Sequence, residues 1–170
     1  KTGGTGIILS NQSQIIRPTP KNKDFQQVLD CGMVGLYALE VMPKQFVTFY
    51  IIYGATNGEN DPQASSTTCD LISLILQDMA ESTHGATIIC GDLNANTGSI
   101  PSLANALSEG LLKDIGKYGS LFGGNDNQPT CRANPKASAT RRDYVFANQQ
   151  AESLIDKFAV LDDSHLPVHS

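Results

Sequence analysis

Apolar and polar residues follow two different periods along this chain. Val34 to Met42 and Phe46 to Tyr53 are apolar runs rich in β-branched and aromatic residues, and Pro43-Lys44-Gln45 separates them. This order is typical of an antiparallel hairpin. From Gln63 to about Thr83, the apolar residues recur at helical spacing. We therefore expect a helix there, with its apolar stripe packed on the core.

The remaining pattern continues this alternation of strands and helices. A polar stretch with two prolines, Gln12 to Lys23, predicts a loop. His84-Gly85 predicts the end of the preceding helix, because glycine suits the position after a helix. Further along, we expect a strand at Ile88 to Cys90, a weaker helix from Ile100 to Leu112, a loop from Gly116 to Asn127, and strands at Arg142 to Ala147 and Leu154 to Leu161. The whole pattern is that of an α/β sandwich with mixed, largely antiparallel sheets.

One stretch carries polar residues at the end of a buried strand. Ile88-Ile89-Cys90 runs into Gly91, which permits a sharp bend, and Asp92 and Asn94 follow. Two residues apart in extended chain, Asp92 and Asn94 project from the same face. A carboxylate and an amide in this arrangement suit divalent-metal and phosphate chemistry. The alternative is a strand that ends in an Asx turn.

Length, composition and charge limit which kinds of protein this chain can be. The chain has 170 residues, 40% of them hydrophobic, which predicts a single domain over residues 1–170. Because the formal net charge is −5, the chain would need a local basic patch or bound metal ions to bind a polyanion. No apolar run approaches the roughly 18 residues of a membrane span. Four widely spaced cysteines indicate neither zinc nor a disulfide framework, which favours a reducing, intracellular compartment.

Four short motifs, far apart in the sequence, follow one another along the chain. Tyr53 ends a strand, Gly91-Asp92-Leu93-Asn94 ends another, Arg142-Asp143-Tyr144-Val145-Phe146 follows Pro129-Thr130, and Ser164-His165-Leu166-Pro167-Val168 comes last. This series resembles the endonuclease/exonuclease/phosphatase superfamily, which includes pancreatic-type deoxyribonuclease, apurinic-site endonucleases and retrotransposon endonucleases. The resemblance covers nearly the whole chain.

The resemblance implies a four-layered α/β sandwich and Mg²⁺- or Mn²⁺-dependent hydrolysis of a phosphodiester. It implies that Asp92 orients or deprotonates the attacking water and that Asn94 holds a phosphate oxygen. It also implies that His165 contacts the phosphoryl group, and that Asp143 fixes the tautomer of His165, a role that the chemistry of imidazole supports independently.

Further candidates concern the substrate. By the same resemblance, Tyr53 is a phosphate-side tyrosine and Asn57 is the loop asparagine that follows it; a half-buried strand aromatic is the alternative for Tyr53. The basic residues near the Asp143 strand are Arg132, Lys136, Arg141 and Arg142. Arg141 and Arg142 are the candidates for contact with a nucleic-acid backbone or another phosphodiester substrate, and a solvated charged loop is the alternative.

Two departures from the family pattern leave the enzymatic activity open. Ser164 precedes His165 where the family has an aspartate, so Asp163 becomes the candidate metal ligand. The family's N-terminal strands, with a Gln-Glu pair whose glutamate binds metal, are absent from the sequence. We therefore expect a truncated or partly observed chain whose incomplete sandwich is covered by an unseen N-terminal segment or a partner protein. The leading function is a nuclease-like, Mg-dependent phosphodiesterase; the alternative is a catalytically inactive accessory or scaffold subunit in a larger assembly.

Overall fold

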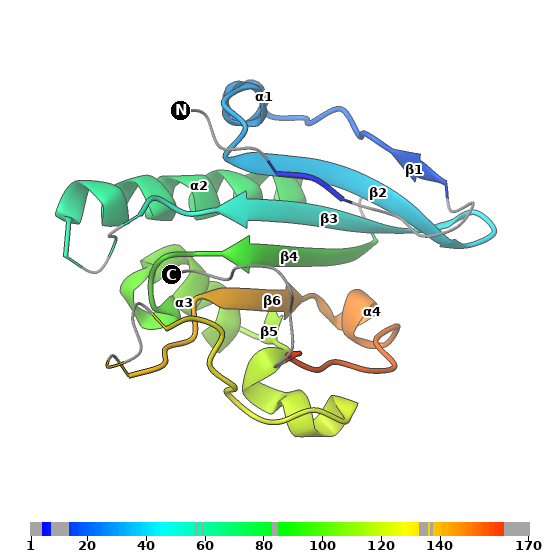
Figure 1. Ribbon diagram of the computed structural model, residues 1–170. Helices are drawn as coiled ribbons and strands as arrows, with labels where there is room; N and C mark the ends of the chain where they lie inside the picture. Colours follow the sequence, from blue (N-terminus) through cyan, green and yellow to red (C-terminus); the bar gives the residue numbers. More distant parts are fainter. Residues whose placement is uncertain are drawn as a thin grey trace.

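The computed structural model describes residues 5–7, 14–56, 58, 60–82, 85–132, 136 and 138–161. Its strands form one six-stranded sheet in the order β1-β2-β3-β4-β6-β5 (Figure 1). Neighbouring strands are antiparallel except β3 and β4, which are parallel and joined through helix α2. The predicted α/β class with a mixed, largely antiparallel sheet is therefore confirmed. Of the expected sandwich, the described residues contribute this one sheet.

The strands are β1 (Ile15–Ile16), β2 (Val34–Met42), β3 (Gln45–Tyr53), β4 (Ala86–Asp92), β5 (Lys113–Asp114) and β6 (Asp143–Ala147). The helices are α1 (Lys23–Asp30), α2 (Pro62–Glu81), α3 (Pro101–Ser108) and α4 (Gln149–Glu152), with 3₁₀ segments η1 (Thr97–Ser99) and η2 (Gly116–Phe122). Among the described helices, none is long and apolar enough to cross a membrane.

Helix α2 begins where its sequence provides a cap. The side chain of Asp61 accepts a hydrogen bond of 2.9 Å from the backbone N–H of Gln63, and Pro62 occupies the first helical turn. Both features satisfy or remove backbone donors that the first turn leaves without a partner. The helix then crosses back over the sheet, so that β3 and β4 run in the same direction and end at the same edge.

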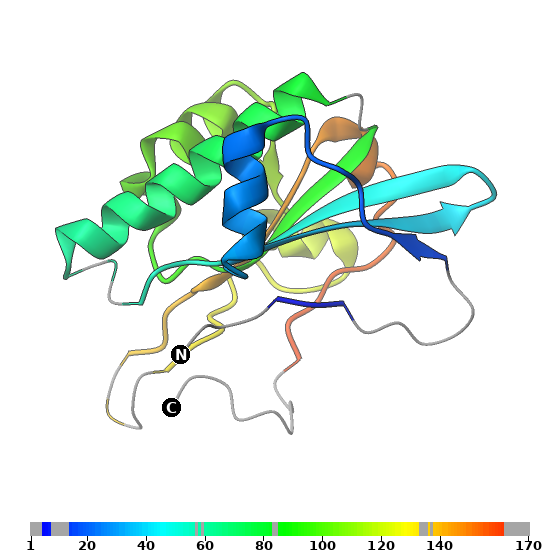
Figure 2. The same ribbon diagram turned by 90° about the horizontal axis from the view of Figure 1, so that it is seen from above.

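Helices α1, α2 and α3 lie together on one face of the sheet (Figure 2). They bury a continuous apolar core against β2, β3, β4 and β6. The largest fully buried side chains of this core include Phe25, Tyr50, Ile72, Leu103 and Phe146. This core confirms the prediction that the apolar stripe of α2 serves packing.

A buried polar contact ties α2 to the sheet within this core. The Tyr50 hydroxyl donates to Asp78 Oδ2 at 2.7 Å, and the backbone N–H of Lys21 donates to Asp78 Oδ1 at 3.0 Å. Tyr50 and Asp78 are both fully buried. Burial, followed by the hydrogen bond and negative charge of Asp78, raises the pKa of Tyr50 far above its usual value. The hydroxyl therefore remains a donor throughout the working range of pH.

We expect Tyr50→Phe to lower the free energy of unfolding by about 1–3 kcal/mol, because it leaves one oxygen of a buried carboxylate without its donor. Tyr37→Phe is the matched control, since the Tyr37 hydroxyl donates to the backbone carbonyl of Thr5 at 3.2 Å in a partly buried setting. Urea denaturation followed by circular dichroism measures both. Equal losses in the two variants would contradict a special role for the buried pair.

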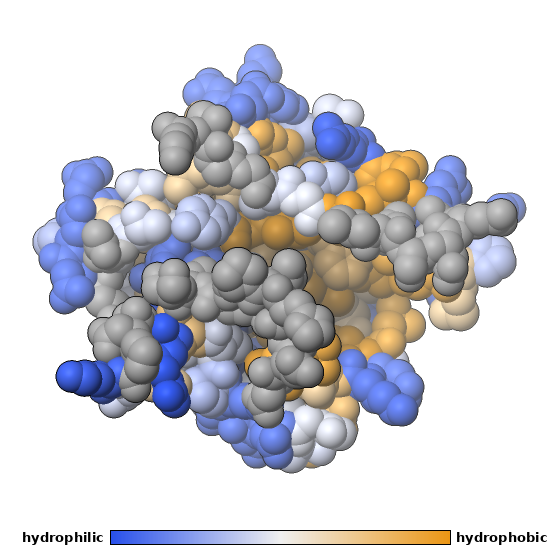
Figure 3. Space-filling view, in the orientation of Figure 1, coloured by the Kyte–Doolittle hydropathy of each residue, from blue (hydrophilic) through white to orange (hydrophobic). Residues whose placement is uncertain are grey.

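The opposite face of the sheet carries a second, smaller cluster. Val47, Ala86 and Ala147 are buried there against Ile115 and Ala151, with Phe122, Ile155 and Phe158 packed around them. Figure 3 views this side and shows hydrophobic surface in a hollow over the strands. That a further segment or a partner protein covers this face remains a prediction.

Three segments differ from the sequence prediction in the N-terminal half. A loop was expected from Gln12 to Lys23. Within it, Ile15–Ile16 pairs with β2, and α1 begins at its last residue, Lys23. Helix α1 lies outside every predicted element, although its apolar residues Phe25, Val28 and Leu29 have helical spacing; it is short, with 8 residues, and most of them are polar. Helix α2 ends at Glu81 with Ser82 as its cap, so Gly85 does not terminate it.

Two further segments differ in the C-terminal half. The expected loop from Gly116 begins with η2, which is kinked at Tyr118. The strand predicted from Leu154 to Leu161 is wrong, because residues 155–161 belong to no strand of the sheet. The backbone N–H of Phe158 instead donates to the Phe122 carbonyl at 3.0 Å, and Phe158 packs on the second cluster. The apolar residues of this segment are therefore buried by packing. Apolar periodicity alone does not distinguish such a segment from a strand.

Candidate functional site

Three candidate residues from distant parts of the sequence meet at one edge of the sheet. In the register of the strands, Asp92 at the end of β4 lies opposite Tyr53 at the end of β3 and opposite Asp143 at the start of β6. Partners in neighbouring strands present their side chains on the same face, with Cβ atoms roughly 4.5–5.5 Å apart in an antiparallel pair. The sheet therefore places two carboxylates and a phenol side by side.

Tyr53, Asp92 and Asp143, which form a row across three strands, differ in their exposure to solvent. Asp92 is 6% exposed, while Tyr53 is 40% exposed. Asp143 is half-buried. The buried Asp92 thus lies between the exposed Tyr53 and the half-buried Asp143.

The turn after β4 holds Asp92 and Asn94 in place. The backbone N–H of Asn94 donates to Asp92 Oδ1 at 2.8 Å, and Asn94 Nδ2 donates to the carbonyl of Gly54 at 3.0 Å. Asn94 has a left-handed φ of 49°, a conformation that asparagine tolerates. The backbone N–H of Gly54 in turn donates to the Asp92 carbonyl at 2.7 Å. The Asx turn weighed as an alternative is therefore present, and it also joins the ends of β3 and β4.

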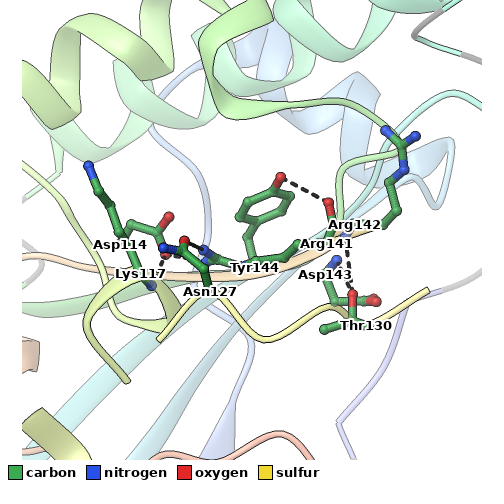
Figure 4. A network of polar contacts seen from close by, with 8 residues as sticks. All are labelled: Asp114, Lys117, Asn127, Thr130, Arg141, Arg142, Asp143 and Tyr144. Atoms are coloured by element: carbon green, nitrogen blue, oxygen red, sulfur yellow. Dashed lines mark hydrogen bonds and ion pairs between the residues drawn. The ribbon is translucent and has the colours of Figure 1, made fainter. Parts of the chain in front are cut away.

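A threonine hydroxyl fixes the start of β6. Thr130 Oγ1 accepts hydrogen bonds from the backbone N–H groups of Arg142 and Asp143 at 3.1 and 3.0 Å (Figure 4). The segment that carries Thr130 is itself held by backbone bonds between Cys131 and Thr140. The hydroxyl thus sets where β6 begins, and with it the position of Asp143 beside Asp92.

We expect Thr130→Val to lower the free energy of unfolding by about 1–3 kcal/mol, because an isosteric methyl leaves two partly buried N–H groups without their acceptor. Thr140→Val is the control, since Thr140 is exposed and pairs through its backbone. Chemical denaturation gives both values. A loss in the Thr140 variant as large as that in the Thr130 variant would contradict the role of the hydroxyl.

The two arginines of this region lie in different surroundings. Arg141 forms an ion pair with Asp114, donates to Asn127 Oδ1 at 3.3 Å, and lies 4.5 Å over the ring of Tyr144. Its side chain is only 12% exposed. These contacts tie β6 to the segment around Asp114, so they do not support the expectation that Arg141 meets a substrate. Arg142 points away from Asp143 (Figure 4), and its substrate role stays a prediction.

The charges of the site residues affect the pKa of a nearby cysteine, Cys131. Burial raises the pKa of the Cys131 thiol, and the charges of Asp92 and Asp143 raise it further, against an opposing effect of Arg142. Among these charges, that of Asp92 has the largest effect on the thiol.

Several predicted site residues cannot be placed. Asn57, Asp163 and His165 lie outside the described residues, so their roles remain predictions. Within the described ranges, no group of three or more His, Cys, Asp or Glu side chains could hold a metal ion. The predicted metal ligand, Asp163, is not among the described residues; Asp92 and Asp143 are the carboxylates that the structure places at the candidate site.

Comparison with known proteins supports the architecture. No protein-family model and no curated protein matches the sequence. Among solved structures, a β-hairpin deletion mutant of beta toxin from Staphylococcus aureus is similar over 79% of this chain and 51% of its own, at 15% identity and a TM-score of 0.50. Over the matched part, the chain has the same fold as this toxin.

Other solved structures with lower TM-scores are similar as well. Truncated TDP2 from Caenorhabditis elegans matches 81% of this chain and 52% of its own, at 14% identity and a TM-score of 0.47. An endonuclease/exonuclease/phosphatase family protein from Bacteroides thetaiotaomicron matches 68% of this chain and 40% of its own, at 15% identity and a TM-score of 0.45. The chain thus spans about half the length of these structures, or less.

The candidate site also depends on residues to which the sequence assigns no role. Thr130 was part of the motif order, but nothing in the sequence indicated that its hydroxyl binds the start of β6. The partnership of Asp114 with Arg141 was equally hidden, because 27 positions separate them. A threonine and an isolated aspartate carry no signal of this kind; only the pairing of β5 with β6 brings Asp114 near Arg141.

Proposed function

We propose that this chain forms part of a nuclease-like, Mg²⁺-dependent phosphodiesterase. The observation that carries the proposal is the alignment of Tyr53, Asp92 and Asp143 on three neighbouring strands. The fold supports hydrolysis of phosphodiesters in general, since the superfamily resemblance implies it. Substrate class and metal are the finer parts of the proposal.

The residues present fit a hard cation. Asp92 and Asp143 lie directly opposite each other on antiparallel strands, an arrangement in which like charges are destabilising. A divalent cation between them removes this repulsion. Mg²⁺ is typically held by one or two carboxylates together with substrate phosphate and water. Asp92 and Asp143 would hold it, and the bound ion would stabilise the negative charge that develops at phosphorus.

The side chains of the chain itself supply binding and orientation. Tyr53 is exposed enough to donate its hydroxyl to a phosphoryl oxygen. Asp92, buried and oriented by the Asn94 N–H, presents a fixed acceptor that can orient a water and take its proton. Asp143 lies on the opposite strand at the same level, where it can accept an N–H of the imidazole of His165, as the resemblance implies.

A second candidate function is a catalytically inactive accessory subunit with the same fold. The amide of Asn94 and the guanidinium of Arg141 favour it, because both groups are engaged in contacts within the fold. In that case the row of carboxylates is inherited and the protein contributes a binding surface.

The deciding experiment combines metal binding and hydrolysis. Mg²⁺ and Mn²⁺ are titrated into the chain by calorimetry, and hydrolysis of bis(4-nitrophenyl) phosphate is followed in the same buffers. The phosphodiesterase proposal expects metal binding in the millimolar range or tighter and metal-dependent release of 4-nitrophenol. Neither binding nor release, from a chain whose circular dichroism shows it folded, would favour the accessory subunit.

A further inference from the structure

A cavity of about 610 Å³ lies at the outer edge of the sheet, beside its last strand, β5. Its lining comes from both sides of this strand, because Leu107 and Leu112 pack in the core with the helices and Ala147 belongs to the second cluster. Ala147 and the site residue Asp143 stand at opposite ends of β6, roughly 13 Å apart in an extended strand. The cavity is therefore separate from the candidate site, and it wraps around the edge of the sheet.

The charged side chains that line the cavity are unequally engaged. Asp114 forms an ion pair with Arg141, and Glu152 forms one with Lys113. Lys117 is exposed, and within the part of the chain that the structure describes it forms no ion pair. The cavity thus has one positive charge that no carboxylate balances, in a chain whose formal net charge is −5.

A tyrosine ring brings two lysines of the lining together. The Nζ atoms of Lys113 and Lys117 lie 5.5 and 5.6 Å from the centroid of the Tyr118 ring, within the range of cation–π contacts. The 3₁₀ segment η2 is kinked at Tyr118, and this residue is 41% exposed. Because both ammonium groups lie near one exposed ring, a single anion beside that ring is attracted by both.

The remaining lining suits a hydrocarbon. Leu107, Leu112 and Leu121 line the cavity, and Leu121 is 67% exposed. Gly110 leaves space at the wall, since a Cβ there would meet nothing within 4 Å. A concave site of this volume, with apolar walls and a few charged groups, is typical of small-molecule sites. An inorganic anion would leave these leucines in water, whereas an anion with an apolar body removes them from it.

We propose that this cavity binds a small apolar monocarboxylate. Its carboxylate lies beside Lys113 and Lys117, where the ammonium groups donate charge-assisted hydrogen bonds. Its hydrocarbon body packs against the three leucines of the lining. One negative charge matches the one lysine that no carboxylate balances. The site does not depend on the proposed phosphodiesterase reaction, because the residues of the row do not line it.

The test compares three probes by calorimetry. Octanoate carries both parts of the expected ligand, octanamide keeps the hydrocarbon body without the charge, and acetate keeps the charge without the body. We expect saturable binding of octanoate in the millimolar range or tighter. Octanamide and acetate should bind about tenfold more weakly, because each loses one of the two contributions. Octanamide binding as tight as that of octanoate would overturn the site, and so would the absence of saturable octanoate binding.

Charge variants with effects of opposite sign locate the carboxylate. Lys117→Met removes the unbalanced charge and should raise the dissociation constant of octanoate about fivefold. Lys23→Met, at the exposed start of α1, is the matched control and should leave it unchanged. Glu152→Gln removes the carboxylate that competes for Lys113, so it should lower the dissociation constant about threefold. Weaker binding in the Glu152 variant would contradict the assignment.

Two exposed leucines give the matched pair for the hydrocarbon. Leu121→Gln should weaken octanoate binding, because Leu121 lines the cavity. Leu111→Gln should not, since Leu111 is 60% exposed and lies outside the lining. These side chains are exposed, so both variants should fold, which circular dichroism verifies. Octanoate bound on the open face of the sheet instead would respond to none of the lysine, glutamate and leucine substitutions, and that result would overturn the inference.

Discussion

Asp92→Asn is expected to lower metal-dependent hydrolysis of a phosphodiester by about 10²- to 10⁴-fold, the usual contribution of a group that takes or positions a proton. The substitution removes the negative charge and the proton acceptor but keeps an oxygen at the Oδ1 position. That oxygen can still accept the N–H of Asn94, which now lies 2.8 Å from Asp92 Oδ1. The turn after β4 is therefore retained while the chemistry is lost. Initial rates at saturating Mg²⁺ measure the effect.

Two comparisons make the result specific. Asp70→Asn removes a carboxylate from the exposed surface of α2, so it controls for the change in net charge and should leave the rate within twofold. Calorimetry should show weaker Mg²⁺ binding by the Asp92 variant alone. If the Asp92 variant hydrolyses substrate at the wild-type rate, Asp92 is not the acceptor, and the row of carboxylates needs another assignment.

The sequence predicts the candidate site as far as it predicts the strands whose ends carry the site residues. Tyr53, Asp92 and Asp143 each stand at the boundary of an apolar run, and the register places them opposite one another. Apolar runs indicate where these three strands lie, because burial of alternate residues is typical of a strand. The resemblance supplied the order of the motifs, and the register shows that this order corresponds to neighbours in space.

What could not be predicted depends on long-range contacts. Nothing local distinguishes Arg141, tied to Asp114, from Arg142 beside it. The apolar run after Leu154 packs without joining the sheet, since burial alone satisfies its side chains. Helix α1 depends on Asn22, whose side chain accepts the N–H groups of Asp24 and Phe25. This cap and the apolar spacing of Phe25, Val28 and Leu29 that follows it are local signals, so α1 is a helix that the sequence does indicate.

Gly91→Ala is the substitution with the largest expected cost in stability. Gly91 has φ of +138°, a conformation that is closed to residues with a Cβ. A Cβ there would lie 2.0 Å from the backbone carbonyl oxygen of Ile52, in the neighbouring strand. Because the obstacle is backbone in the middle of the sheet, no rotation of a side chain relieves it. We expect a loss of more than about 4 kcal/mol, or a chain that does not fold.

Gly110→Ala is the comparison. Gly110 also has a positive φ, of +73°, but a Cβ there meets nothing within 4 Å. This variant carries the conformational cost of the left-handed region alone, about 1–2 kcal/mol. The excess in Gly91→Ala over Gly110→Ala, measured by urea denaturation, is then the cost of separating β4 from β3 together with the greater strain of a φ of +138°. That separation has a chemical consequence, because Asp92 follows Gly91 directly and Tyr53 follows Ile52. If Gly91→Ala folds, β4 must shift against β3, and hydrolysis must fall with it. A stable Gly91 variant with full activity would show that the pairing of Asp92 with Tyr53 is not required for the reaction.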